Sequence, residues 1–211
     1  MRAGIFDLDG TLVDSIGDIG GAMNAALAAH GLPQHPIDAY RRFVGDGVQK
    51  LVERALGGRG ELAEAVLAEY RREYAERLLA TTVPYPGVLD AVDALADRGI
   101  ALAVLSNKPQ LATQRIVAAL FPGRFRVVLG ERTGVPRKPD PAAALEIAAA
   151  LDVAPAATAF VGDTAVDMRT AVAAGMHPIG VLWGFRGRDE ITAAGARDVI
   201  AAATELVALF A

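Results

Sequence analysis

Short apolar runs recur along the chain and alternate with segments that carry apolar residues at helical spacing. Such runs lie at Ala3 to Phe6, Ile100 to Leu105, Phe125 to Leu129, Ala159 to Val161 and Ile179 to Trp183. Each run is followed by polar or glycine-containing residues, which is typical of buried strands. Short strands that alternate with helices predict a parallel sheet covered by helices on both faces.

This alternation is interrupted between about residues 15 and 80. Helical spacing without an intervening strand is found at Ile16 to His30, Val48 to Leu56 and Glu61 to Leu79. The prolines and glycine of Thr81 to Gly87 then predict a stiff, non-helical return. We therefore expect a Rossmann-like α/β core made of residues 1–14 and 81–211, with an all-helical cap inserted at residues 15–80.

Length and composition fit one large domain, or one domain that carries an insertion. The chain has 211 residues, and the 53% that are hydrophobic provide ample apolar surface for a core. It has no cysteine, which excludes disulfides, thiolate zinc sites and cysteine nucleophiles and fits a reducing compartment. The 21 basic residues face 25 acidic ones and form no basic run, so nucleic acid is not an expected partner.

The sequence also predicts no association with membranes. Asp7 and Asp9 fall where a secretion signal would need a long apolar stretch, and no later stretch approaches the length of a membrane-spanning helix. We expect a cytoplasmic protein that is a monomer or a homodimer.

Polar residues of one chemical kind follow four of the five predicted strands. They are Asp7, Asp9, Gly10 and Thr11, then Ser106, Asn107 and Lys108, then Lys138, and finally Gly162, Asp163 and Asp167. Ligands bind beyond the carboxyl ends of parallel strands, so we expect these side chains to converge. The second set is improbable by composition alone, because the chain has only three lysines, two serines and two asparagines.

A converged set of this kind suits phosphoryl transfer. Acidic oxygens without histidine or cysteine select Mg²⁺ over zinc, and Mg²⁺ typically shares a substrate phosphate. A carboxylate can attack phosphorus when the metal and a lysine neutralise the charge that otherwise repels it. A second carboxyl group two residues along the chain can donate a proton to the leaving alkoxide. Mg²⁺ is therefore the expected cofactor, and a small phosphate ester is the expected ligand.

Each of these motifs also has an ordinary structural explanation. Asp7 and Asp9 could be turn residues before Gly10, and Asp163 could cap a helix. Lys138 could be a solvated loop lysine. The occurrence of all the motifs in one chain favours the chemical interpretation.

Four segments are similar to the four motifs of the haloacid dehalogenase superfamily phosphatases in both order and spacing. They are Asp7 to Ser15, Ser106 to Pro109, Lys138 to Pro141, and Phe160 to Thr164 with Asp167. The match covers nearly the whole chain. Tyr85 to Val88, Val44 to Val48 and Ala171 to Gly175 further resemble the phosphoglycolate phosphatase branch of this superfamily.

The resemblance implies a role for each motif residue. Asp7 would be the nucleophile that forms an aspartyl-phosphate, and Asp9 the general acid that later deprotonates water. The dehalogenases of the superfamily lack an aspartate at the position of Asp9, so the presence of Asp9 favours a phosphatase or phosphomutase. Thr11, Ser106 and the Asn107 main chain would bind the phosphate, and Lys138 would stabilise its charge. Asp7, the Asp9 carbonyl and Asp163 would bind Mg²⁺, with Asp167 as a further or outer ligand. Gly45, Asp46 and Gly47 would contact the substrate from the cap.

The resemblance makes 2-phosphoglycolate the expected substrate, and several alternatives stay open. Within the superfamily they are a pyrophosphatase, a sugar-phosphate phosphatase and a β-phosphoglucomutase-like enzyme. A receiver-type signalling module also places Asp, Mg²⁺, Ser or Thr and Lys at the ends of a parallel sheet. Receivers, however, have no helical insertion, and their phosphorylated aspartate follows a middle strand of the chain instead of the first. A non-catalytic binding protein of the same fold is less favoured, because no motif position carries an inactivating replacement.

Overall fold

A parallel sheet of six strands forms the centre of the computed structural model, which describes residues 1–210. In spatial order the strands are β5 (Val127–Glu131), β4 (Ala101–Pro109), β1 (Ala3–Phe6), β6 (Thr158–Gly162), β7 (His177–Val181) and β8 (Asp198–Ile200). All neighbouring pairs in this sheet are parallel. The chain crosses from β5 at one edge of the sheet to β6 on the far side of β1, so the strand order reverses beside β1. Parallel sheets bind ligands beyond the carboxyl ends of the strands at the place where the strand order reverses.

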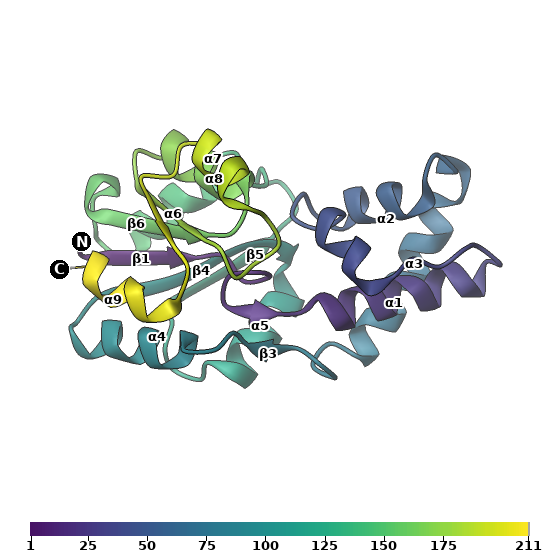
Figure 1. The fold of residues 1–211 in the computed structure, drawn as a ribbon, viewed down its shortest axis with the longest axis horizontal. Coiled ribbons are helices and arrows are strands. Elements are labelled where there is room, and N and C mark those ends of the chain that lie inside the picture. The colour runs from purple at the N-terminus through teal and green to yellow at the C-terminus, as the bar shows by residue number, and fades with distance from the viewer. Residues whose placement is uncertain (211) are drawn as a thin grey trace.

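Alternate residues of the central strands β1, β4 and β6 enter two apolar cores, one on each face of the sheet. In β1, Phe6 joins one core and Ile5 joins the other. The first core contains residues of α4 (Val88–Asp97), α5 (Gln110–Leu120) and α9 (Leu206–Leu209), and the second contains residues of α6 (Ala142–Ala150) and α7 (Ala165–Ala173). Figure 1 shows α4 and α9 on one side of the sheet and α6, α7 and α8 (Arg188–Ala193) on the other. Because both faces are covered, the strands are apolar at successive positions instead of alternating with polar residues.

A separate group of helices lies beyond the carboxyl ends of the strands, on the right of Figure 1. The group consists of α1 (Ile16–Ala29), η1 (Ile37–Arg42), α2 (Val48–Leu56), η2 (Gly60–Leu62) and α3 (Ala63–Glu76). Its interior is built from buried apolar side chains such as Met23, Tyr40 and Val66. These helices occupy the stretch in which the sequence predicts an inserted cap.

A short antiparallel ribbon connects this helical group to the sheet. Its strands are β2 (Val13–Asp14) and β3 (Val83–Pro84). Near the start of α1, the buried Asp18 carboxylate accepts hydrogen bonds from the main-chain N–H and hydroxyl groups of both Thr81 and Thr82, at 2.6 to 3.1 Å. The outgoing and returning segments of the chain are therefore fastened to each other beside the ribbon.

The predicted fold class is confirmed, and the predicted elements differ from the structure mainly at their ends. The strand predicted to end at Leu105 continues to Pro109, because Pro109 pairs with Glu131 after a register irregularity. The strands β2, β3 and β8 and the helix η1 are not predicted. The three strands have only two or three residues each, too few to show a periodic pattern. Within residues 1–210, no helix combines the length and the apolar character needed to cross a membrane.

Candidate active site

Lys138 lies between two carboxylates at the end of the central strand. Its Nζ atom is 2.9 Å from Oδ1 of Asp7, which directly follows β1, and 2.7 Å from Oδ1 of Asp167 in the first turn of α7. The Lys138 side chain is only 2% exposed. The sequence prediction that these residues converge is therefore confirmed in space, although they are far apart along the chain.

Three carboxylates come together at this point. Asp7, Asp163 and Asp167 are all buried, and each offers one oxygen atom within 4.8 Å of the others. Asp167 is fixed by a capping box at the start of α7, in which its Oδ2 accepts hydrogen bonds from the main chain and the hydroxyl of Thr164. The prediction that Asp163 and Asp167 face one centre thus agrees with the structure.

The loop after β1 and the segment after β7 together hold Asp163 in place. The Thr11 hydroxyl donates to Oδ1 of Asp163 at 3.1 Å, and the Phe185 main chain donates to Oδ2 at 2.7 Å. Gly10 has a φ of +87°, and a side chain there would collide with the Asp163 carboxylate. Thr11, a predicted phosphate ligand, is buried and uses its hydroxyl to orient Asp163.

Burial dominates the electrostatics of this centre. It raises the pKa of Asp7 to about 7, against the lowering effect of Lys138 and with a further contribution from the Asp167 charge. Burial and the charge of Asp167 also raise the pKa of Asp163 well above its usual range. Burial disfavours the charged form of Lys138, but the two neighbouring carboxylates outweigh it and raise its pKa.

The same centre fits a divalent cation. When all three carboxylates are ionised, they exceed the single ammonium charge of Lys138 in a buried space, and a bound cation would neutralise the excess. The donors are oxygen atoms only, which is the ligand set of Mg²⁺. Among residues 1–210, Asp7, Asp163 and Asp167 are thus the group that could hold a metal.

The Asp9 carboxylate has different partners. Lys108 Nζ donates to both of its oxygens, at 2.8 and 2.7 Å, and the Ser15 hydroxyl donates to Oδ1 at 2.6 Å. The Asp9 side chain is not part of the three-carboxylate group. Metal binding by Asp9 was expected through its main-chain carbonyl, and this stays a prediction.

The predicted phosphate-binding residues Ser106 and Asn107 lie at the end of β4, where both line a pocket. The Asn107 side chain binds Lys138 twice, donating to its carbonyl oxygen and accepting from its N–H, each at 3.0 Å. It also donates to the carbonyl oxygen of Gly45 at 3.0 Å. Ser106 Oγ accepts a hydrogen bond from the Lys108 main chain at 3.2 Å.

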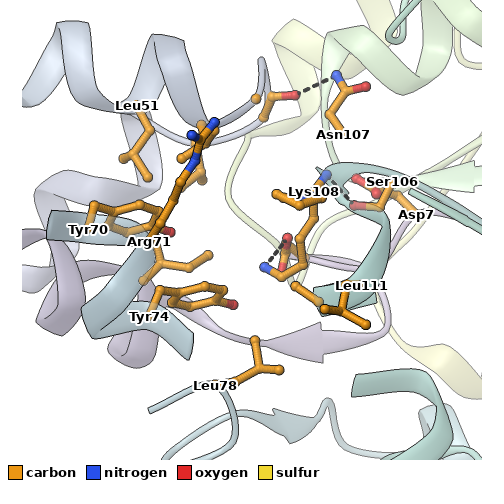
Figure 2. A pocket seen from close by; sticks show the side chains of 18 of the residues that line it. Asp7, Leu51, Tyr70, Arg71, Tyr74, Leu78, Ser106, Asn107, Lys108 and Leu111 are labelled. Carbon is orange, nitrogen blue, oxygen red and sulfur yellow. Dashed lines mark hydrogen bonds and ion pairs between the residues drawn. The ribbon is translucent and has the colours of Figure 1, made fainter. Parts of the chain in front are cut away.

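The pocket lies between the strand ends and the helical group and has a volume of about 260 Å³ (Figure 2). Asp7, Asp9 and the Ser106 to Pro109 segment line it on the core side, and Gly45, Gly47, Leu51, Tyr70, Tyr74 and Leu78 line it on the helical side. Of the three predicted cap contacts, Gly45 and Gly47 therefore line the pocket, whereas the Asp46 carboxylate forms an ion pair with Arg54 at 2.5 Å. The pocket has one charged end and an otherwise largely apolar wall.

Lys108 and Tyr74 are site residues that the sequence analysis did not assign. Lys108 belongs to the Ser106 to Lys108 cluster, and the scarcity of lysine in this chain already marked the residue as unusual. Its contact with Asp9 depends on tertiary structure and could not be predicted. Tyr74 gave no signal, because an aromatic residue at helical spacing normally belongs to the core. In the structure its ring lies 4.9 Å from Lys108 Nζ.

The fold and the site together define a Rossmann-like α/β protein with a buried acidic centre at the carboxyl ends of its parallel strands. The sequence profile of the haloacid dehalogenase-like hydrolases matches residues 1–175. The chain belongs to this family, as its motifs predicted. Membership confirms the expectation of an enzyme and decides against a receiver-type signalling module.

The relatives and solved structures that resemble the chain are consistent with this family. The chain is 38% identical to a phosphoglycolate phosphatase of Pseudomonas putida over 87% of its own length and 70% of the relative. It is 36% identical to a phosphoglycolate phosphatase of Psychrobacter arcticus over 88% and 85% of the two chains. A crystal structure from Lactobacillus delbrueckii subsp. bulgaricus superimposes with a TM-score of 0.93 at 33% identity, covering 99% and 98% of the two chains. These relatives confirm the class of phosphoric monoester hydrolase.

Proposed function

We propose that the protein is a Mg²⁺-dependent phosphatase that hydrolyses 2-phosphoglycolate to glycolate and phosphate through an aspartyl-phosphate on Asp7. The observation that carries the reaction type is the position of Asp7, which lines the pocket while its carboxylate contacts Lys138 inside the three-carboxylate group. The two relatives named phosphoglycolate phosphatases support the choice of substrate.

In the first step, an oxygen of Asp7 forms a bond to phosphorus as the bond from phosphorus to the ester oxygen breaks. Lys138, 2.9 Å from that carboxylate, offsets the negative charge that the nucleophile and the phosphate bring together. The Ser106 hydroxyl and the Asn107 main chain hold the phosphate oxygens. Asp9 donates a proton to the leaving oxygen. In the second step it accepts a proton from the water that attacks phosphorus, and the bond from phosphorus to the Asp7 oxygen breaks to release phosphate and the free carboxylate.

Mg²⁺ would be held by Asp7, Asp163 and the Asp9 carbonyl, with Asp167 nearby. When bound, the ion neutralises the carboxylates and the phosphate. This assignment rests on the buried oxygen ligands and on the excess negative charge of the centre. The Thr11 and Phe185 contacts with Asp163 fix the orientation of this ligand, which directly follows β6.

We further infer that residues 15–80 act as a cap that closes over the core formed by residues 1–14 and 81–211. The pocket lies between the two parts, and the β2–β3 ribbon carries both chain crossings. The hydrogen bond from Asn107 to the Gly45 carbonyl ties the cap to the end of β4, where the phosphate would be held. Closure of such an element excludes water from the reaction.

A panel of phosphorylated metabolites tests the proposed reaction and its substrate. Phosphate release would be measured from 2-phosphoglycolate, pyrophosphate, sugar phosphates and p-nitrophenyl phosphate, each with Mg²⁺ and with EDTA. We expect the highest kcat/KM for 2-phosphoglycolate, loss of activity in EDTA, and no turnover by Asp7→Asn. A preference for pyrophosphate or a sugar phosphate would replace the substrate, and full activity in EDTA would contradict the metal-dependent mechanism. Isomerisation of β-glucose 1-phosphate without phosphate release would indicate a mutase.

A further inference from the structure

Tyr74 of α3 has a buried hydroxyl group without a hydrogen-bond partner among residues 1–210. The residue is 7% exposed and lines the pocket. In Figure 2 its hydroxyl is directed across the pocket toward the end of the Lys108 side chain. A buried hydroxyl without a partner is unfavourable, because it has lost its bonds to water. Its position next to a cavity indicates that a bound molecule supplies the missing partner.

Lys108 provides a positive charge at the same place. Its side chain is 5% exposed, and two of the three donors of an ammonium group are accounted for by the two oxygens of Asp9. The Nζ atom lies 4.9 Å from the centre of the Tyr74 ring. One N–H donor of Lys108 and the Tyr74 hydroxyl are thus available close together in the pocket.

The Tyr74 ring is fixed before any ligand arrives. It stacks on Tyr70, with ring centres 5.5 Å apart and planes inclined by 10°. Burial, with smaller contributions from Asp9 and Asp18, raises the pKa of the Tyr74 hydroxyl well above its usual range. The shift favours the protonated hydroxyl, which can act as a hydrogen-bond donor.

We propose that Lys108 and Tyr74 bind a second oxyanion, located on the leaving group of the substrate. This inference rests on the proposed function, because it places the phosphate of the same molecule at Asp7, which lines the same pocket. The substrate class is a phosphomonoester with a carboxylate a few atoms from the ester oxygen. A second phosphate offers the same chemistry, and the test below separates the two.

The surrounding wall strengthens this contact and restricts it to one place. Leu51, Leu78 and Leu111 line the pocket and have no charge to offer an anion. Arg71 and Arg115 also line it, but both are exposed to solvent, which weakens their attraction for a ligand. Lys108 is therefore the buried cation of the pocket lining, and the Tyr74 hydroxyl lies beside it.

The test compares three substrates that differ at the proposed contact. 2-Phosphoglycolate and 2-hydroxyethyl phosphate have the same chain length and similar leaving alcohols, but only the first has a carboxylate. Fructose 1,6-bisphosphate carries a second phosphate. We expect wild type to prefer 2-phosphoglycolate over 2-hydroxyethyl phosphate in kcat/KM. Tyr74→Phe, which keeps the ring, should reduce this preference by roughly tenfold, mainly through a higher KM for 2-phosphoglycolate.

Tyr85→Phe is the matched control. Tyr85 also has a buried hydroxyl without a partner among residues 1–210, but it does not line the pocket. We expect this variant to keep the wild-type preference. Lys108→Met should reduce the preference at least as much as Tyr74→Phe, because it removes the charge itself. A larger effect of both variants on the bisphosphate than on 2-phosphoglycolate would assign the site to a second phosphate.

The inference is overturned if Tyr74→Phe slows both two-carbon substrates equally, since the hydroxyl would then act only on structure. It is also overturned if wild type shows no preference for either doubly anionic substrate. Hydrolysis of p-nitrophenyl phosphate, measured in parallel, helps to separate failure of the phosphatase reaction from failure of the oxyanion site. Absence of phosphate release from p-nitrophenyl phosphate and from all three test substrates would refute the phosphatase reaction, and with it this inference. Phosphate release without the preference would refute the oxyanion site alone.

Discussion

The Asn107 side chain binds the main chain of Lys138 through both of its polar atoms, donating to the carbonyl oxygen and accepting from the N–H at 3.0 Å each. Asn107 lies at the end of β4, and Lys138 lies in the loop after β5. A single amide therefore sets the position of the lysine whose ammonium contacts Asp7 and Asp167. This is a positioning role, in addition to the expected contact of the Asn107 main chain with phosphate.

We predict that Asn107→Ala lowers both stability and activity. The variant leaves buried main-chain groups of Lys138 without partners, which costs about 1–3 kcal/mol of unfolding free energy. Displacement of Lys138 should lower kcat by at least tenfold, as measured by phosphate release in parallel with urea unfolding.

The chain provides a matched control in its other asparagine. The Asn24 side chain binds the main chain of His35 in the same two-sided way, at 2.8 and 3.0 Å, inside the helical group. Asn24→Ala should lose comparable stability and keep kcat within about twofold, because Asn24 binds His35 and does not line the pocket. Equal losses of kcat in the two variants would show that activity follows stability, and that Asn107 has no special influence on Lys138.

Sequence alone predicted the residues of the acidic centre, because each follows a recognisable apolar strand and parallel strands present their carboxyl ends together. It did not predict which carboxylate pairs with which cation. The expected roles of Asp9, as a general acid and as a metal ligand through its carbonyl, did not indicate that its carboxylate would bind Lys108 and Ser15. Such pairings depend on the direction of side chains at strand ends, which the sequence pattern does not specify. The extension of β4 to Pro109 was also not predicted, because a register irregularity leaves no periodic pattern.

The Asp18 contacts with the returning chain lead to a prediction about stability. Asp18→Ala removes the acceptor of four donor groups on Thr81 and Thr82, and Thr82 is buried. We expect a loss of roughly 2–4 kcal/mol in unfolding free energy, measured by urea denaturation. Asp38→Ala is the control, because the Asp38 side chain is 91% exposed and its removal should cost little. A loss below about 0.5 kcal/mol for Asp18→Ala would show that the contacts do not fasten the cap.

The raised pKa of Asp7 predicts a pH-dependent effect of Mg²⁺ on stability. In the metal-free protein, folded Asp7 releases its proton near pH 7, whereas the unfolded chain releases it near 3.8. The folded state therefore holds more protons between these values, so stability should fall as pH rises from about 4 to 7. Mg²⁺ binds the ionised carboxylates and should reverse this loss.

Thermal unfolding at pH 5 and pH 7.5, with Mg²⁺ or EDTA, checks this expectation. The increase in Tm caused by Mg²⁺ should be clearly larger at pH 7.5. Asp7→Asn removes the titrating group and one ligand, so it should reduce both the pH dependence in EDTA and the gain from Mg²⁺. An equal gain at the two pH values would mean that the ion binds elsewhere or does not compete with protons.

The final prediction separates the role of Asp9 from that of the metal ligands by varying the leaving group. A general acid contributes roughly 10² to 10⁴-fold where the departing oxygen needs a proton, and much less where it leaves readily as an anion. Asp9→Asn should therefore slow aspartyl-phosphate formation from 2-phosphoglycolate far more than from p-nitrophenyl phosphate. Only this first step is diagnostic, because Asp9 would also activate water in the second step with either substrate. The phosphoenzyme should then accumulate in the variant supplied with the aryl substrate. If rapid-quench measurements show equal slowing for both substrates, Asp9 acts through the metal site or through its contacts with Lys108 and Ser15, and not as an acid.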